Sequence, residues 1–453
     1  MGESPGTSGA GLSSGGELKR RHIAAATLGN ALEFYDFLTY TFFAIQIGHA
    51  FFPAQSAYGS LMLSLATFGV GFATRPVGAL VLGAYADRVG RKPAMILSYT
   101  MIGASIVAMA LIPSYASIGQ AAPILAVAAR MVQGFSLGGE VGSNTAFLLE
   151  GVAPERRGFT VSWQGSSQLI ALTVGGMVGT ILTALMPHDL LDTYGWRIAF
   201  LLGAATLPFG LWLRNSLPET LHQPETVAVA PAQGTSRLRL AQNSIRIMIL
   251  GLVVLACGTI GSYIFTYIVT YAQNTLHMKP ILGFVAETGG YVLGAVTVLY
   301  GGWLSDRYGR WPVNVYGNLL FLVLIYPTFY WVVATHSAFA LIAGMILLAG
   351  IANFTFGCVC STLAEGLPKP IRGSGFAVVY SVAISVFGGT TQFVVTWLIH
   401  VTGSALAPAW YLLAATAVAQ VAMMMIPESA PAKIARMRSG AAGATVLATP
   451  NWR

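Results

Sequence analysis

The chain has 453 residues, of which 55% are apolar and only 9% are charged, and its mean hydropathy is +0.68. Soluble domains of this length do not have such a composition, which excludes the soluble classes and indicates a chain embedded in a lipid bilayer. The formal net charge of +8 does not indicate nucleic-acid binding, because the basic residues gather in loops on one side of the predicted helices.

Twelve apolar segments are long enough to cross roughly 30 Å of hydrocarbon as helices of about 20 residues. Six precede and six follow the long polar stretch in the middle of the chain. This pattern predicts an all-α integral membrane protein with a six-helix bundle in residues 22–214 and another in 244–427. The twelve segments lie near residues 24–48, 59–83, 93–112, 123–149, 160–186, 198–213, 246–272, 283–303, 312–334, 338–364, 374–400 and 406–426.

Polar segments lie at both ends and in the middle of the chain. Residues 1–21 are expected to form a disordered arm, because they begin rich in Gly and Ser and lack the order of a signal peptide. Residues 215–243 are predicted to be a linker, and 428–453 a charged tail. The loops on the other side carry only Arg197 and Lys279 as basic residues. By the positive-inside rule, both termini are therefore expected in the cytoplasm.

A charged, glycine-bearing loop occurs at the same point of both halves. Gly-Ala-Tyr-Ala-Asp87-Arg-Val-Gly-Arg91 follows the second apolar segment, and Gly-Trp-Leu-Ser-Asp306-Arg-Tyr-Gly-Arg310 follows the eighth. Recurrence at matching points indicates a duplicated membrane protein in which both loops have a shared mechanical role.

A second repeat occurs in the next loops on the same side. Glu150 precedes Arg157-Gly in the first half, and Glu365 precedes Arg372-Gly in the second half. Together with the first repeat, these residues predict a cytoplasmic gate in which charge-assisted bonds hold helix ends together in one state and part in another. The alternative is ordinary solvated loop charge.

The sequence gives no sign of a metal, disulfide or cofactor site. Cys257, Cys358 and Cys360 lie in apolar segments and are expected to be packing residues, and no pair of histidines has the spacing of metal ligands. We therefore expect no metal site and no cofactor. A membrane enzyme is also disfavoured, because the chain lacks a phosphate-binding loop, a ligand cluster and a soluble domain.

Polar residues inside the predicted spans are candidates for substrate and proton binding, because ionisable groups in a membrane are costly. In the first segment, Asn30, Glu33 and Asp36 follow one helix face, so the two carboxylates can share a cavity. Glu140 in the fourth segment is a third candidate for proton coupling. Glu33 is the first choice because it is deepest relative to the helix ends.

Two arginines lie inside predicted spans, Arg75 in the second and Arg130 in the fourth. They stay protonated and need partners, which are either buried carboxylates in structural ion pairs or an anionic substrate. Gln133, Gln164 and Gln168 are amide donors in neighbouring helices. The first half is thus suited to bind a molecule with several carboxylates.

The second half offers hydrogen-bonding groups and little charge, so recognition of charge is expected in the first half and closure in the second. Tyr267 lies in a tyrosine stripe with Tyr263 and Tyr271, which either lines a pore or packs. Asn353 and Tyr380 are further candidates for contact with the substrate.

The repeated loops resemble those of the major facilitator superfamily over nearly the whole chain. Gly29-Asn30-x-Leu-Glu33-x-x-Asp36-Phe, Arg75-Pro-x-Gly, Gln133-Gly-Phe-Ser and Arg157-Gly-x-x-x-Ser-Trp-Gln164 are similar to its metabolite:proton symporter branch. Within that branch, Leu111-Ile-Pro-Ser-Tyr, Gly195-Trp-Arg and Ser385-Val-Phe-Gly-Gly read most like citrate or tricarballylate symporters. The resemblance implies two bundles that rock about a central site in a bacterial inner membrane, with uptake of a tricarboxylate driven by protons, or by sodium as the alternative ion.

Other functions stay open at this point. The same branch includes carriers of 2-oxoglutarate, of shikimate and of betaine-like osmolytes. A nutrient sensor built on a transporter scaffold is a more distant alternative. The partners expected are a small carboxylate and the lipid bilayer, with no nucleic acid, and the chain is expected to be a monomer.

Overall fold

A computed structural model describes residues 20–53, 57–215, 217, 219, 234–431 and 433–434. Most of the expected arm, linker and tail lies outside these described residues. In the described part, each of the twelve predicted segments is helical over most of its length, and no strand is present. The predicted all-α fold class is confirmed. Eight of the described helices are long and apolar enough to cross a membrane.

The helices of the first half begin at Arg20 and end at Asn215. Several of them are longer than the apolar segments that predicted them, because a helix continues past the hydrocarbon region where polar residues can still form it. The described helices are α1 (Arg20–Phe42), α2 (Ala44–Phe51), α3 (Ala57–Arg88), α4 (Arg91–Leu111), α5 (Tyr115–Ile118), α6 (Ala121–Glu150), α7 (Arg157–Leu185), α8 (His188–Leu190), α9 (Trp196–Ala204) and α10 (Leu207–Asn215).

The second half begins earlier than the hydropathy pattern predicts. Its first helix starts at Gly234, inside the expected linker, because Arg, Leu, Ala and Gln in that stretch are good helix formers. The described helices are α11 (Gly234–Thr266), α12 (Ile268–Thr270), α13 (Pro280–Tyr308), α14 (Arg310–Thr335), α15 (Ala338–Phe354), α16 (Phe356–Gly366), α17 (Arg372–Ala383), α18 (Gly389–Thr402) and α19 (Ala407–Met425).

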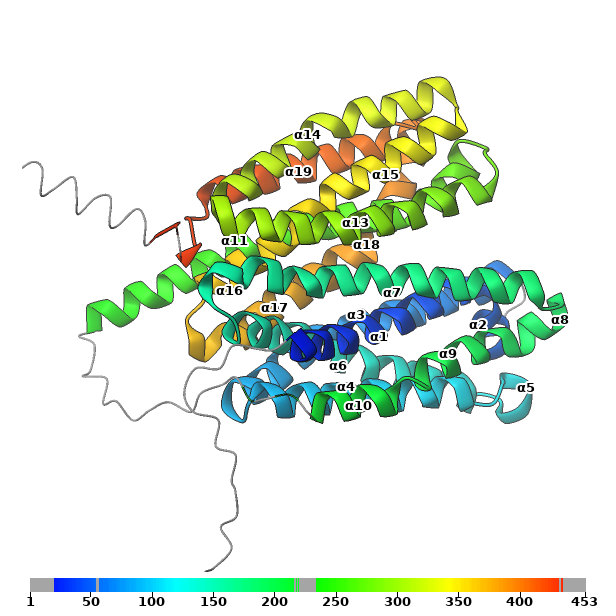
Figure 1. Cartoon of the computed structure of the whole chain (residues 1–453). Helices are drawn as coiled ribbons and strands as arrows, with labels where there is room; N and C mark the ends of the chain where they lie inside the picture. The colour runs from blue at the N-terminus through cyan, green and yellow to red at the C-terminus, as the bar shows by residue number, and fades with distance from the viewer. Residues whose placement is uncertain are drawn as a thin grey trace, which may run out of the picture.

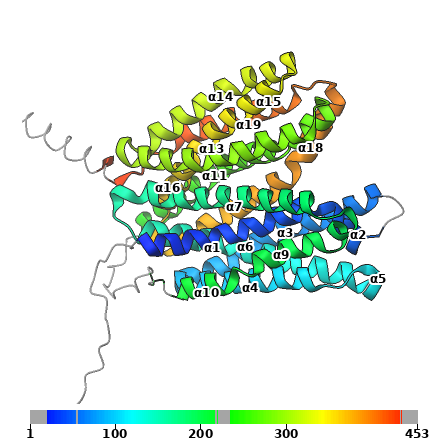
Figure 2. The same cartoon turned by 45° about the vertical axis from the view of Figure 1, so that its right-hand side comes forward.

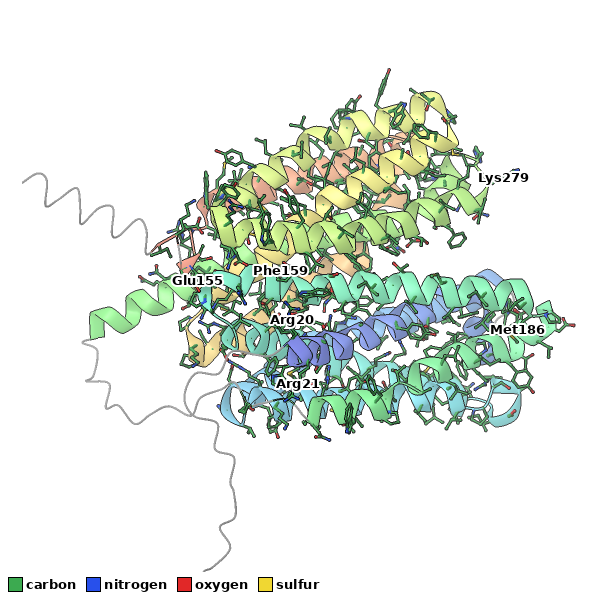
Figure 3. All side chains as sticks on the ribbon, viewed as in Figure 1. Arg20, Arg21, Glu155, Phe159, Met186 and Lys279 are labelled. Atoms are coloured by element: carbon green, nitrogen blue, oxygen red, sulfur yellow. The ribbon has the colours of Figure 1, made fainter. Side chains whose placement is uncertain are left out.

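The helices run in one general direction and form two groups (Figures 1 and 2). The first-half helices lie on one side, and α11, α13, α14, α15 and α19 lie on the other. Contacts between the halves are made by α17 with α3 and α6, and by α13 and α16 with α7. Arg20, Arg21, Glu155 and Phe159 lie at one end of the molecule, whereas Met186 and Lys279 lie at the other (Figure 3).

We call the end that carries the repeated charged loops the latch end. There the buried apolar core is continuous across both halves, because Phe72 and Phe147 belong to the same cluster as Val359 and Phe376. At the opposite end, the described residues form one cluster within each half, around Trp196 in the first and around Phe329 in the second. The halves therefore share a large apolar core at the latch end, and toward the opposite end the described residues share only the small cluster of Leu169, Ala295 and Val298 between α7 and α13.

Glycines bring α3 and α6 into backbone contact. A Cβ added at Gly78 would meet the Phe135 carbonyl, and one added at Gly138 would meet the Arg75 carbonyl. Small residues at such contacts let membrane helices approach closely. This contact positions the two intramembrane arginines, because one is carried by each helix.

We expect Gly138→Ala to destabilise the protein, because neither backbone can move without shifting a whole helix. Overpacking of this kind costs about 1–3 kcal/mol. Gly69→Ala is the matched control on α3, since a Cβ there meets no atom within 4 Å. It is expected to be neutral or slightly stabilising, because alanine is a better helix former than glycine. Thermal unfolding in detergent measures both, and equal midpoints would contradict the close contact.

Candidate functional site

The first repeated loop is tied to the second half at the latch end. Asp87 accepts from Arg91 in its own loop and from the backbone N–H of Ser374 at the start of α17, at 2.9 Å. Arg91 also pairs with Glu150 at 3.3 Å, and Arg372 of the second half pairs with the same Glu150 oxygen at 3.2 Å. A carboxylate at a helix N-terminus is stabilised by the helix dipole. The loop thus joins the halves through charge-assisted bonds.

The second repeated loop makes the corresponding contacts in the opposite direction. Asp306 accepts from the N–H groups of Gly158 and Phe159 at the start of α7, both at 2.8 Å. Arg310 pairs with Asp306 at 2.7 Å and with Glu365 at 3.1 Å. Each half therefore caps the first turn of a helix of the other half.

These latch residues are buried, unlike ordinary loop charges. Both arginines at the loop ends are fully buried, and the side chains of Asp87 and Glu150 are 7% and 3% exposed. The loop glycines, Gly90 and Gly309, have φ values of 143° and 106°, in the region that disfavours residues with a Cβ. Arg157 was expected to share the gate, but it makes no ion pair among the described residues.

A third repeat, overlooked in the sequence, supports both loops. Glu219 accepts from the backbone N–H groups of Arg91 and Lys92, at 2.9 and 3.1 Å. Glu428 accepts from the N–H groups of Arg310 and Trp311, at 2.7 and 3.3 Å. The signal was available, because Leu-Pro-Glu and Ile-Pro-Glu follow the last apolar segment of each half. These glutamates cap the helices that begin at the loop arginines.

We expect Asp87→Asn to loosen the latch end, because it removes the charge that both Arg91 and the start of α17 stabilise. Every 1.4 kcal/mol of stabilisation that the closed latch loses shifts the ratio of open to closed forms by about tenfold. Spin labels at Val89 and Ile371, both exposed, report the distance across this end. Glu155→Gln is the control, as an exposed acid at the same end. Identical distance distributions in the two variants would contradict the latch.

Arg75 and Arg130 line a common pocket between α3 and α6. The Arg75 guanidinium lies over the Phe72 ring at 4.5 Å, and that of Arg130 over the Tyr40 ring at 4.3 Å. Arg130 also donates to the side-chain oxygen of Gln133. Two guanidinium groups at one buried pocket favour an anionic ligand.

The amide residues of the predicted site form a buried network between α1 and α7. Asn30 donates to the Gln164 carbonyl and to the Ser167 hydroxyl, both at 2.9 Å, and Gln168 donates to the Asn30 oxygen at 3.5 Å. The Gln164 side-chain oxygen accepts from Thr145 of α6 at 2.6 Å, while its nitrogen has no partner among the described residues. This nitrogen is available to donate to a substrate.

The second half reaches this region through the helix of the eleventh predicted segment of the chain, residues 374–400. A wide π-helical turn, Ile384–Gly388, joins α17 to α18, and Ser385 in this turn donates to the Phe72 carbonyl at 2.6 Å. The Tyr380 hydroxyl interacts with Gln168 and with the charge of Arg75. Tyr263 packs edge-on against Phe72, with ring centroids 6.2 Å apart. The halves therefore meet at the arginine pocket.

Two of the second-half candidates lie away from this pocket. Tyr267 is buried in the second-half core and its hydroxyl accepts from Thr396 of α18 at 3.1 Å. Asn353 donates to the Ala349 carbonyl of its own helix at 2.9 Å. Of the predicted tyrosine stripe, Tyr263 packs against Phe72 of the first half, whereas Tyr267 and Tyr271 lie in the second-half core.

The three carboxylates proposed for proton coupling separate into two groups. Glu33 and Asp36 lie in α1, but their side chains are outside the described part of the structure. Glu140 forms a fully buried ion pair with Arg214 of α10 at 2.5 Å. Arg214 is the last residue of the predicted first bundle, just past its sixth apolar segment, and it also donates to the Met95 carbonyl at 2.5 Å. The structure thus gives Glu140 a basic partner other than Arg75 or Arg130.

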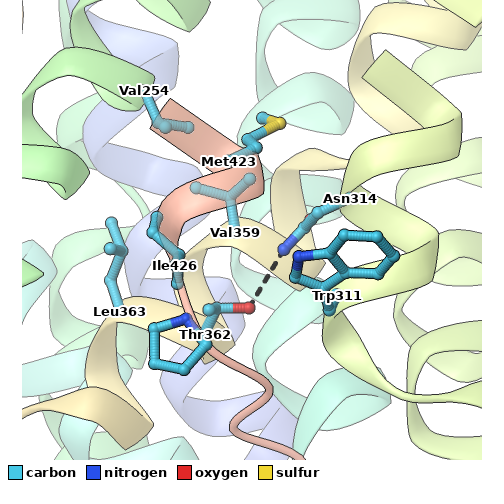
Figure 4. Close-up of a pocket in the computed structure, with 9 residues that line it drawn as sticks. Val254, Trp311, Asn314, Val359, Thr362, Leu363, Met423 and Ile426 are labelled. Atoms are coloured by element: carbon cyan, nitrogen blue, oxygen red, sulfur yellow. Dashed lines mark hydrogen bonds between the residues drawn. The ribbon is translucent and has the colours of Figure 1, made fainter. Parts of the chain in front are cut away.

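A second pocket lies inside the second half near the latch end (Figure 4). Its polar lining is Asn314, which donates to Thr362 at 3.1 Å, and the indole of Trp311. The rest of the lining is apolar, including Val359 and Met423. Without a charged side chain in its lining, this pocket is poorly suited to bind an organic anion.

Comparisons with known proteins bear on the family and the fold of the chain. A model of the Major Facilitator Superfamily matches residues 26–391. The chain is similar to the citrate-proton symporter of Salmonella typhi, with 34% identity over 411 residues, 89% of this chain and 93% of that protein. It is 32% identical to the proline/betaine transporter of Escherichia coli (strain K12), over 91% of this chain and 84% of that protein. The solved structure of a proton:xylose symporter superposes with a TM-score of 0.74 at 16% identity, covering 90% of this chain and 96% of that chain.

Proposed function

The chain belongs to the Major Facilitator Superfamily, and from this premise we propose that it is a proton-coupled symporter that takes up a tricarboxylate such as citrate or tricarballylate. The proposal agrees with the similarity to a citrate-proton symporter over most of both chains. It treats the chain as a transporter and not as an enzyme.

The observation that carries the proposal is the pair of buried arginines at one pocket. Arg75 and Arg130 are 8% and 3% exposed and both line the pocket between α3 and α6. Guanidinium groups bind carboxylates in a planar, two-pronged geometry. A betaine has a single carboxylate, which can pair with one guanidinium group, beside a quaternary ammonium group that the second guanidinium would repel. The pocket therefore favours a polycarboxylate over the osmolyte carried by the betaine relative.

The arrangement of the cores supports an outward-facing state. We assign the latch end to the cytoplasm, because the basic loops lie at that end and the rule of positive inner loops then holds. The large shared core at the latch end closes the inner side. Beyond the small cluster between α7 and α13, the two halves have separate cores on the outer side and can move apart there. An outward-facing carrier is the state that accepts substrate for uptake.

A transport cycle follows from these parts. The acid enters from outside and is bound by Arg75 and Arg130, with Gln164 and Gln168 as amide donors. A proton bound by Glu33 or Asp36 neutralises a carboxylate in the membrane and lowers the cost of closing the outer side. Closure strains the latch, whose capping bonds at α7 and α17 separate, so that the inner side opens and releases acid and proton.

Uptake of labelled citrate into proteoliposomes under an inward proton gradient tests the function. Unlabelled tricarballylate, 2-oxoglutarate, shikimate and betaine are the competitors, and the buffers contain no sodium. We expect gradient-dependent uptake that only the tricarboxylates inhibit. Inhibition by 2-oxoglutarate or shikimate alone would change the substrate and keep the mechanism. Uptake that appears only after sodium is added would replace the proton as coupling ion.

A further inference from the structure

A carboxylate in the second half has no role in the cycle described above. Of the three acidic residues in positions 244–427, Asp306 and Glu365 belong to the latch, and Glu287 lies within α13. Glu287 is nearer to the opposite end than to the latch end, because α13 begins at Pro280 and ends with the repeated loop. A carboxylate within a membrane span is expensive and is a functional candidate.

Glu287 is held by a tyrosine one turn along its own helix. The Tyr291 hydroxyl donates to the Glu287 carboxylate at 2.6 Å, and the Thr266 hydroxyl of α11 lies 3.5 Å from the same tyrosine oxygen. The Glu287 side chain is partly buried. A hydroxyl donor in this position stabilises the ionised carboxylate, whereas the surrounding membrane favours its protonated form.

The Glu287–Tyr291 pair lies where α13 packs against α7 of the first half. Tyr291 packs in one cluster with Leu169 and Leu172 of α7. One turn farther toward the latch end, Ser166 of α7 donates to the Ala295 carbonyl at 2.9 Å. This places the pair on the outer side of Gln168, beside the path between the opposite end and the arginine pocket.

The ionisable neighbours of Glu287 are few in the described part of the chain. On α11, Tyr263 interacts electrostatically with Tyr291. The other helices packed along α13 add little, because α7 has no ionisable residue beyond Arg157 at its latch-end start and α15 has none. Tyr267 and Tyr271 are engaged elsewhere, with Thr396 and the Ala405 carbonyl. No basic side chain among the described residues forms an ion pair with Glu287, so protonation is the way to neutralise it.

We propose that Glu287 is a second proton-binding residue of the carrier, and that it must be protonated before the junction between α13 and α7, already packed at Tyr291, can close farther toward the outer side. The proposal rests on the proposed proton-coupled uptake. While ionised, the carboxylate needs water or strong donors, and closing the junction would remove that water at a large cost. Once protonated, it can close with Tyr291 as its remaining partner.

The test compares Glu287→Gln with the unaltered protein in proteoliposomes, using the organic acid identified by the competition experiment. Glutamine imitates the protonated carboxyl, so counterflow exchange of labelled acid should persist and should no longer decline at alkaline pH. Gradient-driven accumulation should fall by a factor within the roughly 5- to 150-fold range of coupling between two sites. Glu155→Gln, an exposed acid at the latch end, is the control and should behave like the unaltered protein.

Tyr291→Phe keeps the carboxylate and removes its hydroxyl donor, so it tests the same residue without changing its charge. The ionised form loses a stabilising hydrogen bond, and the alkaline limb of the counterflow profile should move to higher pH. If Glu287→Gln does not fold, the pH profile of Tyr291→Phe still tests whether Glu287 binds the proton.

Two results would overturn the inference. The first is a pH profile and an accumulation ratio in Glu287→Gln that match the unaltered protein. The second is a Tyr291→Phe profile that does not move. Failure of the proposed function gives a different result, because the unaltered protein would then show no proton-dependent uptake of any acid tested.

Discussion

Replacing Arg130 with lysine is expected to weaken binding of the transported acid by roughly 10- to 150-fold, which corresponds to the loss of about 1.5–3 kcal/mol from one charged hydrogen-bonding contact. Lysine keeps the charge but has no planar fork, so it cannot bind a carboxylate through two parallel bonds. It also loses the stacking of the guanidinium on Tyr40 and its bond to Gln133. Titration of purified protein with the acid measures the affinity directly.

Arg88→Lys is the matched control for this prediction. Arg88 is exposed at the end of α3, and its replacement should leave the affinity unchanged. Thermal unfolding of both variants without substrate separates lost binding from lost structure. Near-native affinity in Arg130→Lys would show that Arg130 supports the fold and that the substrate is recognised elsewhere.

Repetition in the sequence made the latch predictable. A duplicated chain presents each loop twice, so Asp87 and Asp306 stand out even though a single charged loop would not. The same logic would have found Glu219 and Glu428, whose Pro-Glu steps recur after the last span of each half. The exchange of caps between the halves could not be predicted. It depends on which helix N-terminus lies beside each loop in the folded chain.

The arginine pocket was predictable in its charges but not in its surroundings. Arg75 and Arg130 are conspicuous because guanidinium groups are rare in membrane spans. Tyr40 and Phe72 are not conspicuous in the sequence, because aromatic residues are common on every face of membrane helices. Glu287 was overlooked for another reason, since one acid within a long apolar span changes its hydropathy only slightly.

The buried pair of Glu140 and Arg214 shows how far the two halves have diverged. Counting back from the repeated Pro-Glu steps, the position that holds Arg214 in the first half holds Met423 in the second. Counting back from Glu150 and Glu365, Glu140 corresponds to Thr355. Met423 and Thr355 are both buried. The same fold element is therefore built with an ion pair in one half and without one in the other.

We expect single and double replacement of this buried ion pair to have opposite effects on stability. Arg214→Met alone should destabilise the protein by about 3–5 kcal/mol, because it leaves the Glu140 carboxylate buried without its basic partner. Glu140→Thr alone should cost a similar amount by leaving the guanidinium charge buried. The double variant copies the residues of the second half. It should recover most of the loss, since replacing both members of a buried ion pair is often neutral or stabilising.

The free energy of unfolding in mixed detergent micelles measures all three variants, with Glu155→Thr and Arg156→Met as an exposed acid and base that serve as the control pair. A double variant as unstable as the worse single variant would show that each residue acts through other contacts, such as the bond from Arg214 to the Met95 carbonyl. If the recovered double variant also accumulates the acid under a proton gradient, Glu140 has a structural role and is not the carboxylate that carries the proton. Proton binding would then fall to Glu33 or Asp36 in the first half and to Glu287 in the second.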